Sequence, residues 1–195
     1  MSVSEGVLRV HHIEPLSRAN GPGRRTVIWF QGCSLGCPGC FNPQTHPFEG
    51  GKEWTTEGLF RKVRRYVPLS EGLTLSGGEP LQQGEALVSF LARVRHQTAW
   101  SVILLTGYTW EEIQALPWGN AVLDHVDVVI AGRYQPEQRL ARGFIGSANK
   151  TVHFLTSRYT LSDFSQVPVA EVIIAPDGGV RVTGIDPVHR VGWQR

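Results

Sequence analysis

The sequence predicts an α/β fold with a mostly parallel sheet, followed by a C-terminal β-hairpin. Short apolar, β-branched runs alternate with segments whose apolar residues recur at helical spacing, which is the pattern of βαβ units. The runs are nearly continuous rather than alternating, as expected for strands covered on both faces. They occupy residues 26–30, 73–75, 102–105, 126–130 and 152–155. Ligands of such folds collect at the carboxyl ends of the strands, so the residues that directly follow these runs are the first candidates for a site.

Three amphipathic segments predict helices between the strands. Two of them carry apolar stripes at helical spacing. These stripes consist of Leu59, Val63, Tyr66 and Val67, and of Leu87, Leu91 and Val94. The third segment begins at Thr109, with Glu112 three residues later in the pattern of a capping box. Towards the C-terminus, residues 171–175 and 180–184 flank a turn at 176–179 and predict a hairpin, either at an edge of the same sheet or as a small appendage.

Composition narrows the function classes. With 195 residues, 41% of them hydrophobic, the chain is long enough for one domain with a real core. A net charge of +2 and the absence of a block of five like charges argue against nucleic acid or a membrane surface as partner. The densest basic stretch, residues 61–65, falls inside a helical pattern and fits a solvated helix face. No apolar run reaches the roughly 18 residues of a membrane span, and the first residues lack a signal-peptide core. The odd number of cysteines, three, argues against a secreted disulfide framework and favours a reducing cytoplasm.

The three cysteines stand in one loop after the first run. Cys33, Cys37 and Cys40 have the spacing C-x3-C-x2-C, and the Gly- and Pro-rich loop can curl to bring three thiolates to one centre. A structural zinc site normally needs four ligands, and His46 could supply the fourth, but zinc cysteines usually come as two separated C-x2-C pairs. A 4Fe-4S cluster normally takes four thiolates, so a cluster held by three keeps one iron open for another ligand.

This spacing resembles that of the radical S-adenosylmethionine (radical SAM) superfamily. The chain is most similar to the activases of glycyl-radical enzymes, in particular those of anaerobic ribonucleoside-triphosphate reductase. The segments that carry the similarity are 20–25, 30–33, 37–43, 75–81, 106–108, 126–128, 132–133 and 146–150. The resemblance implies a partial, open β/α barrel over residues 1–160, with residues 161–195 as a hairpin extension of the same domain. It also implies two cofactors, a 4Fe-4S cluster on the three cysteines and SAM.

The activity that the resemblance implies is a reductive cleavage of SAM to a 5′-deoxyadenosyl radical. That radical would generate a glycyl radical on a partner enzyme such as anaerobic ribonucleotide reductase. A flavodoxin- or ferredoxin-like protein would donate the electron. The implied role of Cys33, Cys37 and Cys40 is therefore both metal binding and catalysis.

The Gly-Gly-Glu-Pro turn follows the second run and comprises Gly77, Gly78, Glu79 and Pro80. Two glycines allow the backbone to approach a ligand where a Cβ would obstruct it. In the family this turn receives the amino group of SAM, which makes Glu79 its expected charge partner. An ordinary strand-to-helix turn, with a carboxylate near a helix N-terminus, is the alternative.

Arg133 follows the fourth run and is the expected partner of the SAM carboxylate, since a guanidinium can bind a carboxylate through two hydrogen bonds. Here the chain departs from the family, because related activases commonly have Asp-Gly-Lys where this chain has residues 131–133 as Ala-Gly-Arg. The departure puts this part of the pocket in question.

Four polar residues complete the expected SAM site. Thr106 and Tyr108 follow the third run, and Ser147 and Asn149 are expected contacts of the ribose or the methionine moiety. Each of them could equally be an ordinary polar residue at the end of a strand. Two other functions stay open: a radical SAM enzyme that modifies a small molecule or peptide, and a non-catalytic iron–sulfur or zinc protein.

Overall fold

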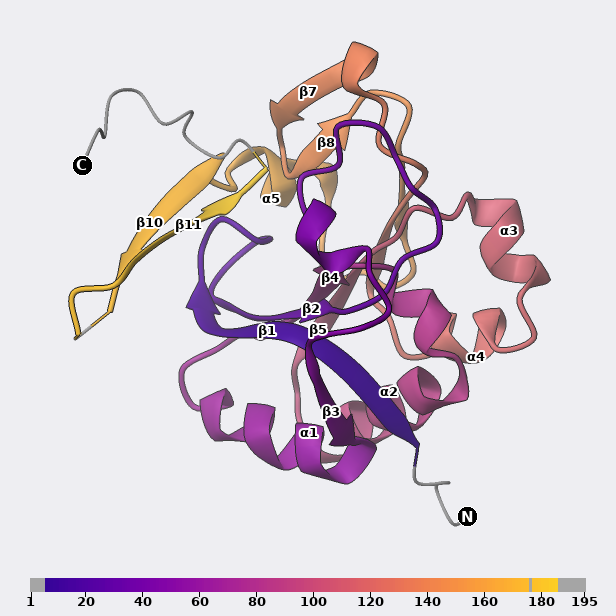
Figure 1. The fold of residues 1–195 in the computed structure, drawn as a ribbon, viewed down its shortest axis with the longest axis vertical. Helices are drawn as coiled ribbons and strands as arrows, with labels where there is room; N and C mark the ends of the chain where they lie inside the picture. Colours follow the sequence, from indigo (N-terminus) through magenta and orange to yellow (C-terminus); the bar gives the residue numbers. More distant parts are fainter. Residues whose placement is uncertain (1–5, 176, 186–195) are drawn as a thin grey trace.

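The fold is a seven-stranded mixed sheet with helices packed on it (Figure 1). The computed structural model describes residues 6–175 and 177–185. The strand order is β3-β1-β2-β4-β5-β6-β9. The strands are β3 (Lys52–Thr55), β1 (Val7–Ser17), β2 (Arg25–Phe30), β4 (Gly72–Gly77), β5 (Ser101–Leu105), β6 (Val128–Ala131) and β9 (Thr151–Phe154).

The centre of the sheet is parallel and its flanks are antiparallel. Strands β2, β4, β5 and β6 pair in parallel, whereas β3–β1, β1–β2 and β6–β9 are antiparallel pairs. The predicted mixed α/β class with parallel central strands is therefore confirmed. The sheet order is open, with β3 and β9 at its edges, and the pairing within the described residues does not confirm a barrel.

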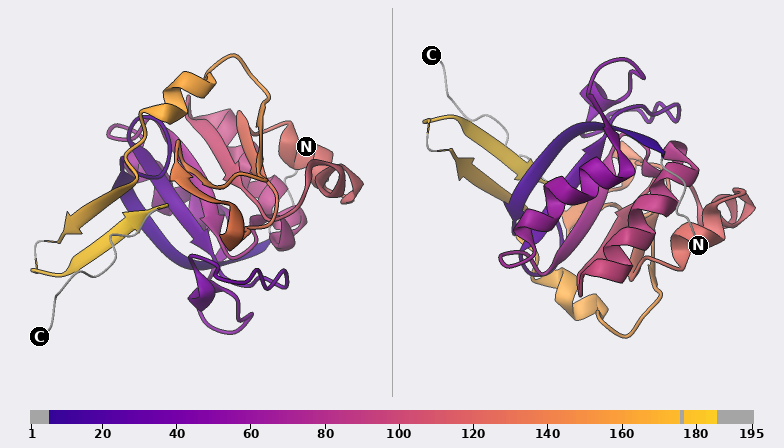
Figure 2. Two further views of the ribbon diagram at one scale, coloured as in Figure 1. Left: turned by 90° about the horizontal axis from the view of Figure 1, so that it is seen from above. Right: turned by 90° about the horizontal axis from the view of Figure 1, so that it is seen from below.

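Helices cover one face of the sheet. They are α1 (Thr56–Val63), α2 (Glu85–Gln97), α3 (Trp110–Ala115) and α4 (Gly119–Leu123). Helices α1 and α2 lie side by side across this face (Figure 2). Their predicted stripes are buried against Leu75, Val102 and Leu104 of the sheet. Helix α1 ends earlier than its stripe suggests, because the chain tightens into a 3₁₀ turn, η2 (Arg64–Tyr66), which carries Tyr66. The capping box of Thr109 and Glu112 at the start of α3 is confirmed.

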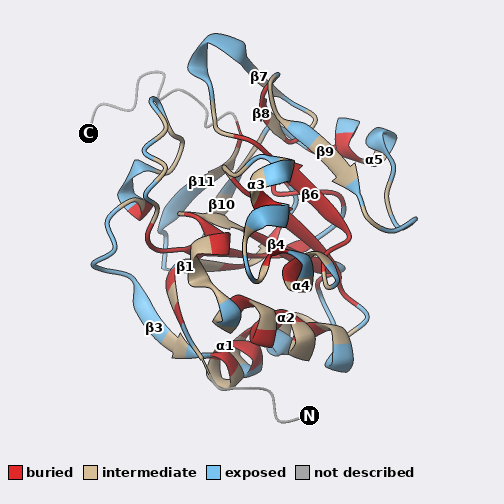
Figure 3. Cartoon of the chain, turned by 90° about the vertical axis from the view of Figure 1, so that its right-hand side faces the viewer, coloured by how far each residue is buried: buried red, intermediate tan, exposed pale blue. Residues whose placement is uncertain are grey.

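The opposite face of the sheet has its own smaller core. Ile103, Val128 and Ile130, which alternate with the residues facing the helices, pack there against Phe144 and Phe164. The central strands are consequently buried on both faces, which explains their continuous apolar sequences (Figure 3). The elements on this side include β7 (Arg139–Arg142), β8 (Ile145–Ser147) and α5 (Leu161–Ser165). Three further 3₁₀ turns are η1 (Pro43–Thr45), η3 (Pro80–Gln83) and η4 (Pro136–Gln138).

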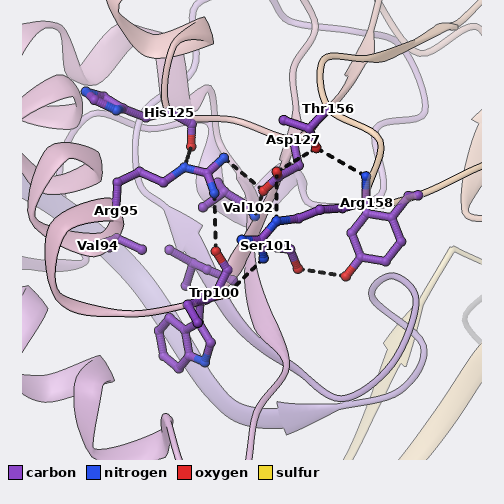
Figure 4. A network of polar contacts seen from close by, with 12 residues as sticks. Val94, Arg95, Trp100, Ser101, Val102, His125, Asp127, Thr156 and Arg158 are labelled. Carbon is purple, nitrogen blue, oxygen red and sulfur yellow. Dashed lines mark hydrogen bonds and ion pairs between the residues drawn. The ribbon is translucent and has the colours of Figure 1, made fainter.

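Asp127 ties several elements together at the amino end of β6 (Figure 4). Its buried carboxylate accepts hydrogen bonds from the backbone N–H of Val102 at 2.7 Å and from the hydroxyl of Thr156 at 2.8 Å. It also forms an ion pair with Arg95 of α2 at 2.9 Å. This network lies at the opposite ends of the parallel strands from the expected ligand site, so its role is structural.

The predicted C-terminal hairpin is present as β10 (Ala170–Ile174) and β11 (Val180–Gly184). It forms a two-stranded sheet of its own and extends away from the body of the molecule (Figures 1 and 2). Arg181 forms an ion pair with Glu14 of β1 at 3.0 Å, and Asn20 donates a hydrogen bond to Thr183 at 2.9 Å. Residue 176 of the predicted turn and residues 186–195 of the predicted extension lie outside the described residues, as do residues 1–5. No helix in the described part of the chain has the length and apolarity to cross a bilayer.

Candidate functional site

A cavity of about 550 Å³ opens at the carboxyl ends of the parallel strands. The cysteine loop after β2, the Gly-Gly-Glu segment after β4 and Thr106 after β5 all contribute to its wall. Residues of the C-terminal hairpin, among them Ile173, Arg181 and Thr183, complete the wall on one side. The cavity therefore lies where ligands of parallel sheets are expected.

All three cysteines line this cavity. Cys33, Cys37 and Cys40 are free thiols and are partly buried, and burial raises the pKa of the Cys33 and Cys40 thiols. The ends of the loop are held together, because the N–H of Cys33 donates to the carbonyl oxygen of His46 at 3.0 Å. Inside the loop, the N–H of Cys40 donates to the carbonyl oxygen of Cys37 at 3.2 Å.

The donor set fits a cluster better than a single metal ion. Among the described residues, no three His, Cys, Asp or Glu side chains converge closely enough to hold one ion. The alternative zinc site of three cysteines with His46 is thus not formed, although His46 also lines the cavity. A cubane cluster instead offers a separate iron to each thiolate, so three thiols that share one cavity suit it without meeting at a point.

The backbone of the Gly-Gly-Glu-Pro turn is fixed directly to the cysteine loop. The N–H of Gly78 donates to Phe30 at the end of β2, and the N–H of Glu79 donates to Gly32, both at 2.9 Å. A Cβ on Gly78 would lie 2.4 Å from the carbonyl oxygen of Gly32, and Gly77 has a φ of +101°. Only glycine allows this approach. Gly77 and Gly78 both line the cavity, whereas Pro80 is buried at the start of η3 and does not.

Glu79 is the most engaged polar residue of the site. Its buried carboxylate accepts hydrogen bonds from the N–H of Leu81 at 3.0 Å, the hydroxyl of Thr106 at 2.8 Å and the N–H of Gly107 at 2.8 Å. Burial raises the pKa of Glu79, and these hydrogen bonds oppose the shift in part. The carboxylate thereby joins the end of β4 to the end of β5 while it also lines the cavity.

Thr106 lies in the wall of the cavity, whereas Tyr108 is not among the lining residues. The hydroxyl of Tyr108 accepts a hydrogen bond from the amide of Gln82 at 3.1 Å. The same amide donates to the hydroxyl of Ser34 in the cysteine loop at 2.7 Å. Tyr108 therefore supports the loop through Gln82 rather than facing the cavity.

Arg133, the expected partner of the SAM carboxylate, is not among the residues that line the cavity. Its guanidinium forms an ion pair with Glu112 of α3, and this contact holds the pKa of Glu112 below its usual range. It also donates to the carbonyl oxygen of Gly107 at 3.1 Å and lies over the ring of Tyr108. The guanidinium of Arg133 is thus held by an ion pair with Glu112 of the neighbouring helix α3.

Ser147 and Asn149 are also outside the wall. The buried hydroxyl of Ser147 accepts a hydrogen bond from the N–H of Gln135 at 3.3 Å. The amide of Asn149 donates to the carbonyl oxygen of Arg133 at 2.9 Å, while its own oxygen is buried with no partner among the described residues. Both residues support the segment after β6, and the Asn149 oxygen is left without a hydrogen-bond partner among the described residues.

Lys150 is a charged residue of the wall that sequence analysis missed. It follows Asn149 directly and belongs to the segment 146–150 that carries the family resemblance, so the sequence held a signal for it. Its ammonium group donates to the carbonyl oxygen of Gly132 at the end of β6. The hairpin residues of the wall were missed as well, because no local pattern shows where a distant hairpin docks.

Comparison with known proteins gives a family match and several relatives. Residues 19–153 match the model of the 4Fe-4S single cluster domain. A pyruvate formate-lyase-activating enzyme from Clostridium pasteurianum is 39% identical over 126 residues, which cover 63% of this chain and 50% of the relative. The chain thus spans about half the length of that relative.

Shorter relatives are covered almost completely. The anaerobic ribonucleoside-triphosphate reductase-activating protein of Vibrio cholerae is 30% identical over 156 residues, which cover 76% of this chain and 99% of the relative. The protein of the same description from Enterobacteria phage T4 is 35% identical over 142 residues, with coverages of 67% and 86%. Among solved structures, QueE from Escherichia coli is 16% identical with a TM-score of 0.44 over 53% of each chain, too low for an argument about the fold.

Proposed function

We propose that this chain cleaves SAM reductively and generates a glycyl radical on a partner enzyme. The premise is its family: the chain belongs to the 4Fe-4S single cluster domain family and, within it, to the radical SAM activases of glycyl-radical enzymes. Anaerobic ribonucleotide reductase is the kind of partner that we infer from the shorter relatives. The observation that carries the proposal is the meeting of three free thiols and the Gly-Gly-Glu turn in one cavity.

In this proposal Cys33, Cys37 and Cys40 hold the 4Fe-4S cluster, and the loop that carries them is kept closed by its backbone hydrogen bonds. The chemistry that the bound cluster and SAM supply is a one-electron cleavage to methionine and a 5′-deoxyadenosyl radical. The protein binds and orients the cofactors and keeps water from the radical. The electron donor that we propose is a flavodoxin- or ferredoxin-like protein.

The Gly-Gly-Glu-Pro turn is the proposed site of the methionine moiety. Gly77 and Gly78 line the cavity and let the turn pack against β2 and the cysteine loop, and Glu79 supplies negative charge for the amino group. Thr106 faces the same space. Pro80, Tyr108, Arg133, Ser147 and Asn149 remain predicted SAM-site residues, and in their observed positions they would act by supporting the wall.

The organisation predicted from the sequence extends this proposal. Residues 1–160 form the radical SAM unit, as an open partial barrel whose strand ends surround SAM, and residues 161–195 form an extension of it. The hairpin residues that line the cavity support the assignment of the extension to the same domain. A reducing cytoplasm is the proposed compartment, because the three thiols must stay reduced to hold a cluster.

A second candidate function is modification of a small molecule or peptide. It is favoured by one observation, the contribution of Ile173, Arg181 and Thr183 to the cavity wall, since the hairpin narrows the side through which a protein loop would enter. A protein substrate needs this side of the cavity to be open, whereas a small substrate is held better when the hairpin encloses it.

The test is anaerobic reconstitution with iron and sulfide, followed by incubation with a reductant and SAM. We expect four irons per chain, as in a 4Fe-4S cluster, and 5′-deoxyadenosine as product. The Cys37→Ala variant should hold no intact cluster. A protein that binds zinc but no iron, or that forms no 5′-deoxyadenosine, would refute the proposal. A glycyl-radical resonance on a co-purified partner enzyme would separate the activase from the second candidate.

A further inference from the structure

We propose that the ammonium group of Lys150 binds the carboxylate of the methionine moiety of SAM. This inference rests on the proposed function and assigns a residue to a part of the site for which the sequence suggested Arg133 instead. Three observations carry it: the position of Lys150, the charges around it, and the engagement of the other cations near the cavity.

Lys150 reaches the cavity from the segment that precedes β9. Its side chain lines the cavity, and its Nζ donates to the carbonyl oxygen of Gly132. An ammonium group has three N–H donors, and only this one hydrogen bond is formed within the described residues. No described carboxylate forms an ion pair with it. Two N–H donors of the ammonium are therefore left for a ligand, and the hydrogen bond to Gly132 fixes the position of the ammonium group in the cavity wall.

The groups around Lys150 mark a place for a zwitterion. Burial lowers the pKa of Lys150, while Glu79, Cys37 and Cys40 act in the opposite direction and favour its charged form. Glu79 accepts three hydrogen bonds from other donors and none from Lys150, so it attracts the ammonium through space and keeps acceptor capacity for a ligand. One negative and one positive group thus face the same cavity, which complements the amino and carboxylate groups of a methionine. A partly buried ammonium gains most from a ligand that restores the interactions lost with water.

The other cations near the cavity are engaged. Arg181 lies in the wall but forms an ion pair with Glu14 at 3.0 Å. Arg133 lies outside the wall and is held by Glu112, by Gly107 and by the ring of Tyr108. Among the lysines and arginines that line the cavity in the described structure, Lys150 is the one without an acidic partner. The hydrogen bond to Gly132 also places the Lys150 ammonium at the end of β6, the strand after which the sequence predicted the partner of the SAM carboxylate.

The experiment measures binding rather than turnover. The reconstituted protein is titrated anaerobically with SAM and with decarboxylated SAM, which lacks only the carboxylate, and the two Kd values are compared. We expect the wild-type protein to bind decarboxylated SAM at least ten-fold more weakly than SAM. The Lys150→Met variant should lose at least ten-fold in affinity for SAM and should no longer distinguish the two ligands. Its iron and sulfide content should equal that of the wild-type protein.

The Lys62→Met variant, in the last turn of α1, is the matched control and should bind SAM as the wild-type protein does. Equal affinity of the wild-type protein for both ligands would overturn the inference without any variant. Unchanged SAM affinity of Lys150→Met would also overturn it. So would a result in which Arg133→Met, but not Lys150→Met, no longer distinguishes SAM from decarboxylated SAM. In each case, a wild-type protein that still binds iron and cleaves SAM would leave the proposed function standing. Failure of the wild-type protein to bind iron or SAM would instead refute the proposed function.

Discussion

The carboxylate of Glu79 lies 2.8 Å from the hydroxyl of Thr106, and this hydrogen bond joins the ends of two neighbouring parallel strands at the cavity. Both oxygens of the carboxylate also accept backbone N–H groups, from Leu81 and from Gly107. Glu79 is therefore part of the framework of the site as well as a candidate ligand of SAM.

We predict that Glu79→Gln destabilises the protein before any cofactor is added. Whichever way the amide is turned, its NH₂ group meets an N–H donor, either that of Leu81 or that of Gly107. The free energy of unfolding should fall by roughly 1–3 kcal/mol. Urea unfolding of the cofactor-free protein measures this change. The exposed Glu85→Gln in the first turn of α2 is the control, and an equal loss in both variants would contradict the prediction.

We predict that Gly78→Ala disrupts the cysteine loop. The new Cβ would meet the carbonyl oxygen of Gly32 at 2.4 Å, and this oxygen accepts the N–H of Glu79. The matched control is Gly36→Ala in the same loop, where no atom lies within 4 Å and only the φ of +59° is unfavourable. The control should lower the free energy of unfolding by about 1–2 kcal/mol, and Gly78→Ala should lower it by more. Thermal unfolding measures stability, and the rate of thiol modification reports the loop; equal rates in the two variants would argue against this role of Gly78.

We predict that Asp127→Asn strongly destabilises the fold without touching the cavity. The buried carboxylate is paired with Arg95 and accepts from Val102 and Thr156, so its charge is compensated on several sides. Removal of one partner of a buried ion pair typically costs about 3–5 kcal/mol. Chemical denaturation gives this value, with the exposed Asp124→Asn as a control of the same type. A loss below about 1 kcal/mol, the size expected of an exposed ion pair, would show that the network is dispensable.

We predict that acid loosens the hairpin. Burial acts to raise the pKa of Glu14, but His12 at 3.7 Å and Arg181 at 3.0 Å outweigh it, so the pKa lies below its ordinary value of 4.5. A lowered pKa in the folded state means that the contribution to stability is present above pH 4.5 and is lost as the pH falls through the folded pKa. Because Arg181 is half-exposed, the contribution is at most about 1 kcal/mol.

Hydrogen exchange in β10 and β11, corrected for its intrinsic pH dependence, measures this effect. Exchange should speed up in the wild-type protein as the pH falls below 4.5, and the Arg181→Met variant should exchange fast at neutral pH already. The Arg65→Met variant, in η2, should behave as the wild-type protein does. A hairpin with the same pH profile in Arg181→Met and in the wild-type protein would show that this ion pair does not hold it.

The central strands and the glycine-rich turns could be predicted from the sequence because their signals are local. A continuous apolar run, a Gly-Gly pair and a capping box such as that of Thr109 and Glu112 each depend on only a few neighbouring residues. Strands β1 and β3 were not predicted, since β1 contains His11, His12 and Pro15 and has no clear apolar alternation. The antiparallel direction of β9 was not predictable either, because the direction of an edge strand is set by the loop that leads to it.

The site was harder to predict where its side chains contact residues that are distant in the sequence. The cysteines and the Gly-Gly-Glu turn stand in recognisable spacings, and the structure brings them to one cavity. Arg133 and Lys150 are both cations near the end of β6, and the sequence favoured Arg133 because it directly follows the fourth apolar run. In the folded chain Arg133 forms an ion pair with Glu112 of α3, and no local pattern in the sequence predicts this contact.

The two strands of the hairpin pair only with each other among the described residues, and the family match ends at residue 153, before the hairpin begins. Insertion, loss or exchange of this arm would leave every register of the main sheet as it is. Such changes would instead alter the side of the cavity that Ile173, Arg181 and Thr183 line, so the space open to a substrate can vary while the sheet beneath it stays the same.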